Sequence, residues 1–194
     1  PSYDIIARFQ GGPNAGHTLE FEGKKYILRS IPSGIFQGDK VNVIGNGVVL
    51  DPILFSEEAR ALSESGHDLR KRLVISRKAH LILPTHRFID AQEAIKGGSK
   101  IGTTGKGIGP TYTDKIARTG LRVGDIHSDF ARKYQEAKER HLTLLEAYHY
   151  PVEGLAELEA KWMEAIKYLE EFTFADSEEY INDALRSSRR VLAE

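Results

Sequence analysis

Two glycine-rich runs hold the residues whose types and spacing could do chemistry. The first run reads Gly11-Gly12-Pro13-Asn14-Ala15-Gly16-His17-Thr18 and follows a stretch of β-forming residues. Glycine lets backbone N–H groups come close to a phosphate, and α/β proteins bind ligands in loops at strand ends. His17 could act as a proton donor, with the hydroxyl of Thr18 beside it. The run predicts either a phosphate-binding loop or a tight turn that carries a surface histidine.

The second run reads Gly102-Thr103-Thr104-Gly105-Lys106-Gly107-Ile108-Gly109-Pro110. Its spacing is neither that of a Walker A loop, because glycine follows Lys106, nor that of a Rossmann loop. Residues 96–122 nevertheless carry six cations and a single acid, Asp114, in a chain whose net charge is −1. This local positive charge predicts a small anionic ligand, and a solvated flexible loop is the alternative. RNA binding is less favoured, because Tyr112 is the only aromatic residue there.

Three further features have mainly structural interpretations. The segment Ile44-Gly45-Asn46-Gly47-Val48 is typical of a hairpin-like turn. The histidines form no HExxH pattern and have no carboxylate at ligand spacing, so we expect them to be packed or exposed: His80, His86, His141 and His149. Nine acids between positions 153 and 179 predict a solvated acidic face, with a partner surface as the alternative.

Composition excludes several classes of protein. The 194 residues include no cysteine, which excludes disulfide frameworks, thiolate metal sites and a cysteine nucleophile, and which fits a reducing, cytoplasmic compartment. The near-zero net charge excludes a nucleic-acid binder that acts through its overall field. No apolar run reaches the roughly 20 residues that a membrane helix needs.

The elements that must position these residues alternate in type along the chain. Strands are predicted at 5–9, 25–31, 41–44, 48–50 and 81–83, and a last one at 190–193. Helices are predicted at 51–66 and 85–95, then from 130 to 148, 155 to 169 and 176 to 188, with Asp51 and Asp176 as N-caps. Residues 97–125 are expected to form a glycine-rich loop. This pattern predicts an α/β sheet, with a helical layer between residues 128 and 188.

Five motifs, in order, resemble the adenylosuccinate synthetase family. They are the run at 11–18, Ile31-Pro32-Ser33-Gly34, the segment 44–49, His80-Leu81-Ile82-Leu83-Pro84 and the run at 101–110, which residues 114–118 and 121–125 follow. The resemblance is strong over residues 4–126, weakens over 127–176 and returns at 184–194. It implies part of a largely parallel central sheet with surrounding helices. We expect an α/β nucleotide-site portion at 1–126, a helical subdomain at 127–188 and a truncated further strand at 189–194.

The resemblance also implies a reaction. The family is a GTP-dependent carbon–nitrogen ligase of purine biosynthesis, which joins IMP and L-aspartate and uses Mg²⁺ to give adenylosuccinate, GDP and phosphate. A carboxylate removes a proton from IMP, the 6-oxygen attacks the γ-phosphate of GTP, and aspartate displaces the phosphate. Phosphoryl transfer of this kind depends on positioning and charge neutralisation, which suits the glycine, threonine and lysine residues of the two runs. The implied enzyme is a cytoplasmic homodimer that engages neither nucleic acid nor a membrane.

The motifs carry the family's site residues onto this sequence. His17 matches the catalytic histidine, a general acid toward the phosphoryl group, and the backbone carbonyl of Gly16 would ligate Mg²⁺. The residues implied to bind IMP are Asn14, Ala15, Gly16, His17, Thr104 and Arg118. Those implied to lie near GTP are Gly16, His17 and Thr18. Arg118 would reach the IMP phosphate of the neighbouring subunit.

The family pattern extends beyond this sequence at both ends. Upstream, the family has a Gly-Asp-Glu-Gly-Lys-Gly loop that carries the catalytic aspartate and cradles GTP, and downstream it has a Gly-Ala-Gln-Gly segment that binds IMP. We therefore expect a central piece of the enzyme that is inert by itself. Two other classes remain open: a noncatalytic α/β module that binds a phosphate or nucleotide through Thr104, Lys106 and Arg118, and a structural or dimerising domain without a ligand.

Overall fold

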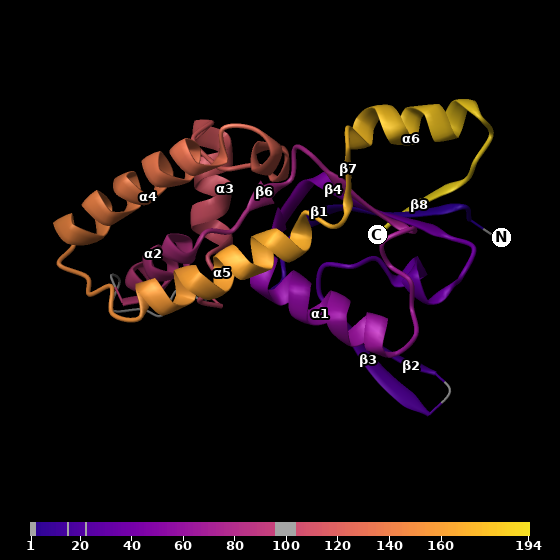
Figure 1. Cartoon of the computed structure of the whole chain (residues 1–194), viewed down its shortest axis with the longest axis horizontal. Helices are drawn as coiled ribbons and strands as arrows, with labels where there is room; N and C mark the ends of the chain where they lie inside the picture. Colours follow the sequence, from indigo (N-terminus) through magenta and orange to yellow (C-terminus); the bar gives the residue numbers. More distant parts are fainter. Residues whose placement is uncertain (1–2, 15, 22, 96–103) are drawn as a thin grey trace.

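A six-stranded parallel sheet forms the centre of the protein (Figure 1). The computed structural model describes residues 3–14, 16–21, 23–95 and 104–194. The strands β1 (Ile5–Gly11), β4 (Val41–Leu50), β5 (Leu73–Ser76), β7 (Thr173–Ala175) and β8 (Val191–Ala193) follow the order β7-β5-β4-β1-β8, and β6 (His80–Leu81) pairs with the end of β4. Every pairing in this sheet is parallel, so the predicted α/β class with a largely parallel sheet is confirmed.

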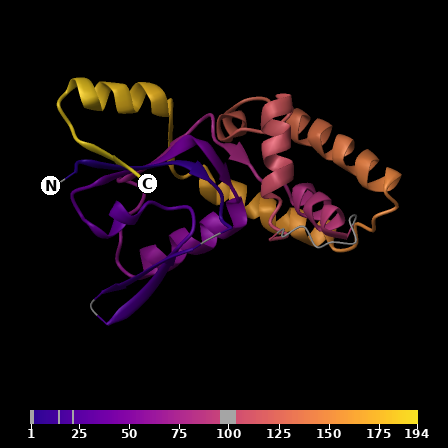
Figure 2. The same ribbon diagram turned by 180° about the vertical axis from the view of Figure 1, so that it is seen from behind.

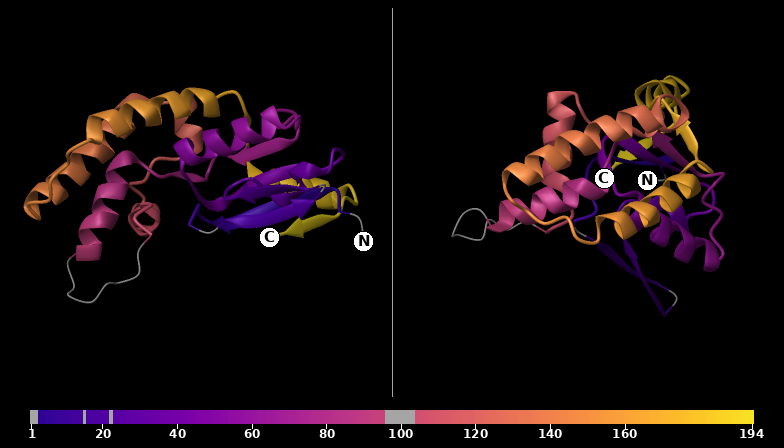
Figure 3. Two further views of the ribbon diagram at one scale, coloured as in Figure 1. Left: turned by 90° about the horizontal axis from the view of Figure 1, so that it is seen from below. Right: turned by 60° about the vertical axis from the view of Figure 1, so that its left-hand side comes forward.

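Helices cover both faces of the sheet. Side chains alternate between the faces of a strand. On one face, Ile44 and Ile75 belong to the main core with residues of α1 (Pro52–Glu64) and α5 (Leu155–Leu169). On the other face, Val43 and Val74 pack with residues of α6 (Ser177–Arg186). The left view of Figure 3 shows α1 lying along its face of the sheet.

The remaining helices gather beside one end of the sheet. They are α2 (Pro84–Ile95), α3 (Ile108–Ala117) and α4 (Phe130–Ala147), with the short 3₁₀ segment η2 (Val123–His127). Another 3₁₀ segment, η1 (Ser33–Phe36), contacts β1 and β4. Figure 2 shows α3 between the sheet and α4, and α3 contacts α2, β4 and β6. Part of the segment 127–188 belongs to the sheet layer, because β7 joins the sheet and α6 packs on it. Among the described residues, no helix is both long and apolar enough to cross a membrane.

Two helix starts confirm the predicted caps. The Asp51 carboxylate accepts hydrogen bonds from the backbone N–H groups of Ile53 and Leu54, and proline occupies the first helical position of α1. Asp176 accepts from the backbone N–H of Glu179 at the start of α6. Both caps depend only on residues within three positions of each other, which explains why sequence alone predicts them.

The predicted hairpin-like turn at 44–48 is wrong, because β4 runs through it as one ten-residue strand. The register shifts between Arg8 and Gln10, where Gln10 pairs with Gly47, so β4 holds an extra residue at this point. A Cβ at Gly45 would lie 3.0 Å from the Arg8 carbonyl oxygen, and one at Gly47 would overlap the Phe9 carbonyl oxygen. The two glycines therefore allow close approach of β1 at a bulge.

The sequence prediction also missed several elements. Residues 97–125 are expected to form a loop, but they contain α3 and the start of η2. The strand predicted at 25–31 is the second arm of an antiparallel hairpin, β2 (His17–Phe21) and β3 (Lys24–Leu28). The short strands β5 and β7 were not predicted at all, since neither shows an alternating pattern.

Candidate functional site

The glycine-rich run at 11–14 lies against α3. The hydroxyl of Tyr112 accepts a hydrogen bond from the Gly11 backbone N–H at 3.1 Å and donates one to the Gly47 carbonyl oxygen at 2.9 Å. A Cβ at Gly12 would lie 2.9 Å from Val49 and 3.1 Å from Ile108, so only glycine fits closely there. The two glycine-rich runs, which are far apart in sequence, therefore meet in the fold.

Lys106 makes the most direct connection between the two runs. Its ammonium nitrogen donates to the Pro13 carbonyl oxygen at 2.9 Å and lies 3.4 Å from that of Asn14. This contact places a positive charge beside the first run, where an anionic ligand would gain from it. Thr104, two residues before Lys106, and Asn14, next to Pro13, are both exposed.

Local geometry fixes the start of α3 behind Lys106. Gly107 has φ of +76°, which favours glycine, and its backbone N–H donates to the buried Asp90 carboxylate at 2.8 Å. A Cβ at Gly107 would lie 2.9 Å from that of His86 on α2. The loop therefore enters α3 in a single close-packed arrangement.

His17 and Thr18 lie on the β2–β3 hairpin, which projects away from the main sheet (Figure 1). Both residues are exposed; His17 pairs with Leu28 and Thr18 with Ile27. Gly16 is exposed just before the hairpin, where a Cβ would lie 2.6 Å from Ile27. Ala15 lies outside the described residues.

Arg118 lies elsewhere, at the opposite end of α3, where it lines a pocket of about 380 Å³. The pocket lies between the end of α3, η2 and α4, beside His80. Its charged lining is mainly basic: Arg118, Arg122, Asp125, Arg132, Lys133, Glu136 and Arg140. None of the described residues of the run at 11–18 lines this pocket. The structure separates the predicted site into two regions, with α3 between them.

The acids of this pocket already have partners. Asp125 forms an ion pair with Lys133 and accepts a hydrogen bond from the backbone N–H of Arg122 at 2.7 Å. Burial and the charges of Lys115 and Arg122 lower the pKa of His80 to about 4. The pocket thus presents guanidinium groups whose charge is only partly compensated, a suitable environment for a phosphate.

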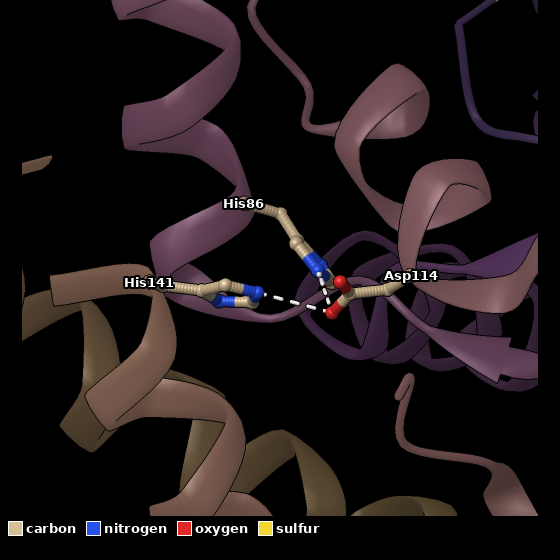
Figure 4. Close-up of side chains that lie close together, drawn as sticks. All are labelled: His86, Asp114 and His141. Atoms are coloured by element: carbon tan, nitrogen blue, oxygen red, sulfur yellow. Dashed lines mark hydrogen bonds and ion pairs between the residues drawn. The ribbon is translucent and has the colours of Figure 1, made fainter. Parts of the chain in front are cut away.

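Sequence reasoning missed a cluster of His86, Asp114 and His141 (Figure 4). One oxygen of Asp114, Oδ2, accepts hydrogen bonds from Nε2 of His86 at 3.1 Å and from Nε2 of His141 at 3.0 Å. Burial would raise the pKa of Asp114, but the hydrogen bonds from His141 and His86 lower it below its ordinary value. Both histidines are buried, and each has a carboxylate partner 27 or 28 positions away that no local pattern shows.

The cluster has the composition of a metal site. The hydrogen bonds around it, however, favour protonated histidine nitrogens that donate to Asp114 over nitrogens that bind a metal ion. The Leu83 backbone N–H donates to Nδ1 of His86 at 3.0 Å, so that nitrogen carries no proton. The proton of a neutral His86 therefore lies on Nε2, which points at Asp114. A metal bound at Nε2 would need this proton to move to Nδ1, where it would oppose the Leu83 N–H.

Comparison with known proteins supplies the family. The family profile described as adenylosuccinate synthetase matches residues 1–194, the whole chain. The chain belongs to the adenylosuccinate synthetase family. It is 70% identical over 195 residues to the adenylosuccinate synthetase of Porphyromonas gingivalis and 65% identical to that of Bacteroides thetaiotaomicron. Each match covers 100% of this chain and 46% of the relative, so the chain spans about half the length of these adenylosuccinate synthetases.

A solved structure supports the same assignment. The chain resembles the fully ligated adenylosuccinate synthetase of Plasmodium falciparum with a TM-score of 0.83 and 32% identity, over 99% of this chain and 45% of the other. The succinoaminodeoxyadenylate synthetase of cyanophage S-2L matches with a TM-score of 0.59 and 22% identity, which shows likeness of fold. The resemblance inferred from the motifs is therefore confirmed at the level of the family.

Proposed function

We propose that this chain supplies part of the active site of an adenylosuccinate synthetase, a ligase of purine biosynthesis. The whole protein would join IMP and L-aspartate with the consumption of GTP, giving adenylosuccinate, GDP and phosphate. The contact between Lys106 and the Pro13 carbonyl oxygen carries the proposal, because it assembles the two glycine-rich runs that the family motifs share. This contact brings the glycines, the hydroxyl groups and the lysine ammonium group of the two runs together. Such groups can position phosphates and neutralise their charge during phosphoryl transfer.

We assign the residues around the first run as follows. His17, exposed at the start of β2, would act as general acid toward the transferred phosphoryl group. The remaining IMP contacts of this region would come from Asn14, Ala15, Gly16 and Thr104, and the GTP contacts from Gly16, His17 and Thr18. The exposure of His17 leaves its imidazole accessible to a bound nucleotide.

Mg²⁺ would neutralise phosphate charge when bound. This chain offers it the backbone carbonyl oxygen of Gly16, an oxygen ligand of the kind that Mg²⁺ prefers. Gly16 is exposed, and a Cβ there would lie 2.6 Å from Ile27, so only glycine fits closely. The imidazoles of the His86–Asp114–His141 cluster fit Mg²⁺ poorly, since it selects oxygen ligands.

Arg118 would act in a homodimer. Gly12 and Pro13 lie against Ile108 and Lys106 at the start of α3, whereas Arg118 follows its other end. An arginine that lines an open basic pocket could therefore reach the IMP phosphate of a second subunit. We further propose that the whole protein works in the cytoplasm, in keeping with a sequence that contains no cysteine.

Titration of the whole protein with IMP tests these assignments. Arg118→Ala should weaken IMP binding about 10- to 100-fold, because a charge-assisted arginine–phosphate contact contributes roughly 1.5–3 kcal/mol. The matched control is Arg186→Ala, which removes an exposed arginine on α6 that pairs with the nearby Asp183. Saturable binding of IMP without any formation of adenylosuccinate would favour a noncatalytic module. The absence of IMP binding by the unaltered protein would contradict the proposal.

A further inference from the structure

Helix α3 joins the two regions of the proposed site. Lys106 just before its start and Tyr112 in its middle contact the first glycine-rich run. Lys115 in its last turn donates to the Asn46 carbonyl oxygen at 2.7 Å in the bulge of β4. At its end, Arg118 lines the basic pocket. The orientation of this one helix therefore sets the relative positions of groups in both regions.

The end of α3 has a conformation that arginine does not favour. Arg118 caps the helix with φ of +62° and ψ of +29°, in the left-handed region. A residue other than glycine is destabilised in this conformation, so it is found there only where contacts with the surrounding structure hold it. Gly120 follows in a tight place, since a Cβ there would lie 2.7 Å from the His80 ring.

Asp114 holds this turn from two sides. Its backbone carbonyl oxygen accepts hydrogen bonds from the N–H groups of Thr119 at 3.0 Å and Gly120 at 3.1 Å. Its side-chain Oδ1 accepts one from the Thr119 hydroxyl at 3.2 Å. The other oxygen, Oδ2, is bound by His86 from α2 and His141 from α4, so the turn is connected to two neighbouring helices.

The two histidines are themselves fixed. Nδ1 of His86 accepts from the Leu83 backbone N–H, as described above, and Nδ1 of His141 lies 2.6 Å from the buried Thr85 hydroxyl. Each ring therefore has a hydrogen-bond partner at both nitrogens, and each ring is buried. This arrangement leaves the Asp114 carboxylate with one orientation.

We propose that Asp114, held by His86 and His141, is a positioning residue that keeps the end of α3 in the left-handed turn from which Arg118 reaches a phosphate. The inference rests on the proposed function, in which that phosphate belongs to IMP. Arg118 touches the ligand, and Asp114 acts only through it. Loss of the Asp114 carboxylate should thus affect the use of IMP and leave the chemistry of bound GTP unaffected.

Steady-state kinetics of the whole synthetase test this inference. Asp114→Asn should raise KM for IMP about tenfold and change kcat and KM for GTP by less than about threefold. Combined with Arg118→Ala, it should add almost nothing to the effect of Arg118→Ala alone, because both remove one interaction. Asp183→Asn, which removes an exposed carboxylate of α6, is the control and should leave KM for IMP unchanged. Additive effects, or an unchanged KM for IMP in Asp114→Asn, would overturn the inference.

A second pair of variants covers the case in which Asp114→Asn does not fold. His141→Leu removes one donor to Asp114, whereas His141→Gln can still donate through its amide. His141→Leu should raise KM for IMP, and His141→Gln should restore most of the affinity. Equal values of KM for IMP in the two variants would contradict the positioning role.

Hydrogen exchange separates this inference from the proposed function. The amides of Thr119 and Gly120, which donate to Asp114, should exchange at least about tenfold faster in His141→Leu, while the amides of α6 keep their rates. Unaltered protein that forms no adenylosuccinate would refute the proposed function alone. Unchanged exchange at Thr119 and Gly120 would refute the positioning role, whatever the activity.

Discussion

His86 couples the stability of the chain to pH at the scale of single residues. Burial lowers its pKa from 6.5 to about 4, with smaller effects in the same direction from His141 and Arg140, although the hydrogen bond that His86 donates to Asp114 acts against this shift. The unfolded state therefore binds more protons between these pH values. This group does not reduce the free energy of unfolding above about pH 6.5. As the pH falls from 6.5 to 4, the free energy of unfolding decreases by up to about 3 kcal/mol because of this group. The lowered pKa of Asp114 acts in the same direction in more acidic solution.

Denaturant unfolding at several pH values between 7 and 4.5 measures this dependence. His86→Gln should be less stable at pH 7 and should reduce the slope of stability against pH by about half, since the pKa of His80 is lowered in the same way. The control, His149→Asn, alters an exposed histidine with φ of +52°, which asparagine tolerates. A slope in His86→Gln equal to that of the unaltered chain would refute this assignment.

Glu58 stabilises the fold through three consecutive backbone groups. Its carboxylate on α1 accepts hydrogen bonds from the N–H groups of Arg29, Ser30 and Ile31, where the chain leaves β3. Glu58→Ala should therefore lower the free energy of unfolding by about 3 kcal/mol, because buried N–H groups lose their acceptor. Glu57→Ala, at an exposed position of the same helix, should cost less than about 0.5 kcal/mol. Equal costs for the two variants in denaturant unfolding would contradict this role.

The sequence reveals local chemistry better than distant chemistry at this scale. The caps at Asp51 and Asp176 follow from neighbouring positions, and the motif at 11–18 indicates the family. The partnership of Asp114 with His86 and His141 follows from the packing of three helices, which no spacing within the sequence encodes. The roles proposed for the site residues depend likewise on bound ligands, which no spacing within the sequence encodes.

The central elements show why the two glycines misled the prediction for β4. Two glycines within five residues ordinarily indicate a turn, but here they form a bulge that lets β1 approach. The glycines at the start of α3 hid a helix in the same way, because Gly107 serves as its left-handed N-cap and Pro110 lies in its first turn. In both places glycine serves close packing, which a sequence pattern cannot distinguish from flexibility.

Gly47→Ala tests the bulge as a structural element. An added Cβ would overlap the Phe9 carbonyl oxygen, so β1 and β4 must separate, and the bond from Tyr112 to the Gly47 carbonyl oxygen must adjust. We expect the free energy of unfolding to fall by about 2 kcal/mol or more in denaturant unfolding. Gly38→Ala, where an added Cβ meets open space, should change it by less than about 0.5 kcal/mol. Comparable losses in the two variants would show that β4 tolerates a side chain at the bulge.

The order of the strands determines which strands are exposed at the edges of the sheet. Within the part of the chain that the structure describes, β8 and β7 lie at the two edges of the sheet. An edge strand presents unpaired backbone groups to other molecules, and β8 adds the exposed side chain of Leu192. The chain spans about half the length of its relatives, so we expect its isolated form to self-associate through this edge and to form no adenylosuccinate.

Sedimentation velocity over a range of concentrations measures that self-association. Leu192→Lys should shift the isolated chain toward monomer, because a charged side chain on an edge strand opposes pairing with another sheet. Leu185→Lys provides the matched control, since Leu185 is also exposed but lies on α6. Arg118→Ala separates this association from a dimer that uses the basic pocket, and it should leave edge pairing intact. Equal effects of the two lysine variants would exclude the edge of β8 as the interface, and an effect confined to Arg118→Ala would assign the association to the pocket.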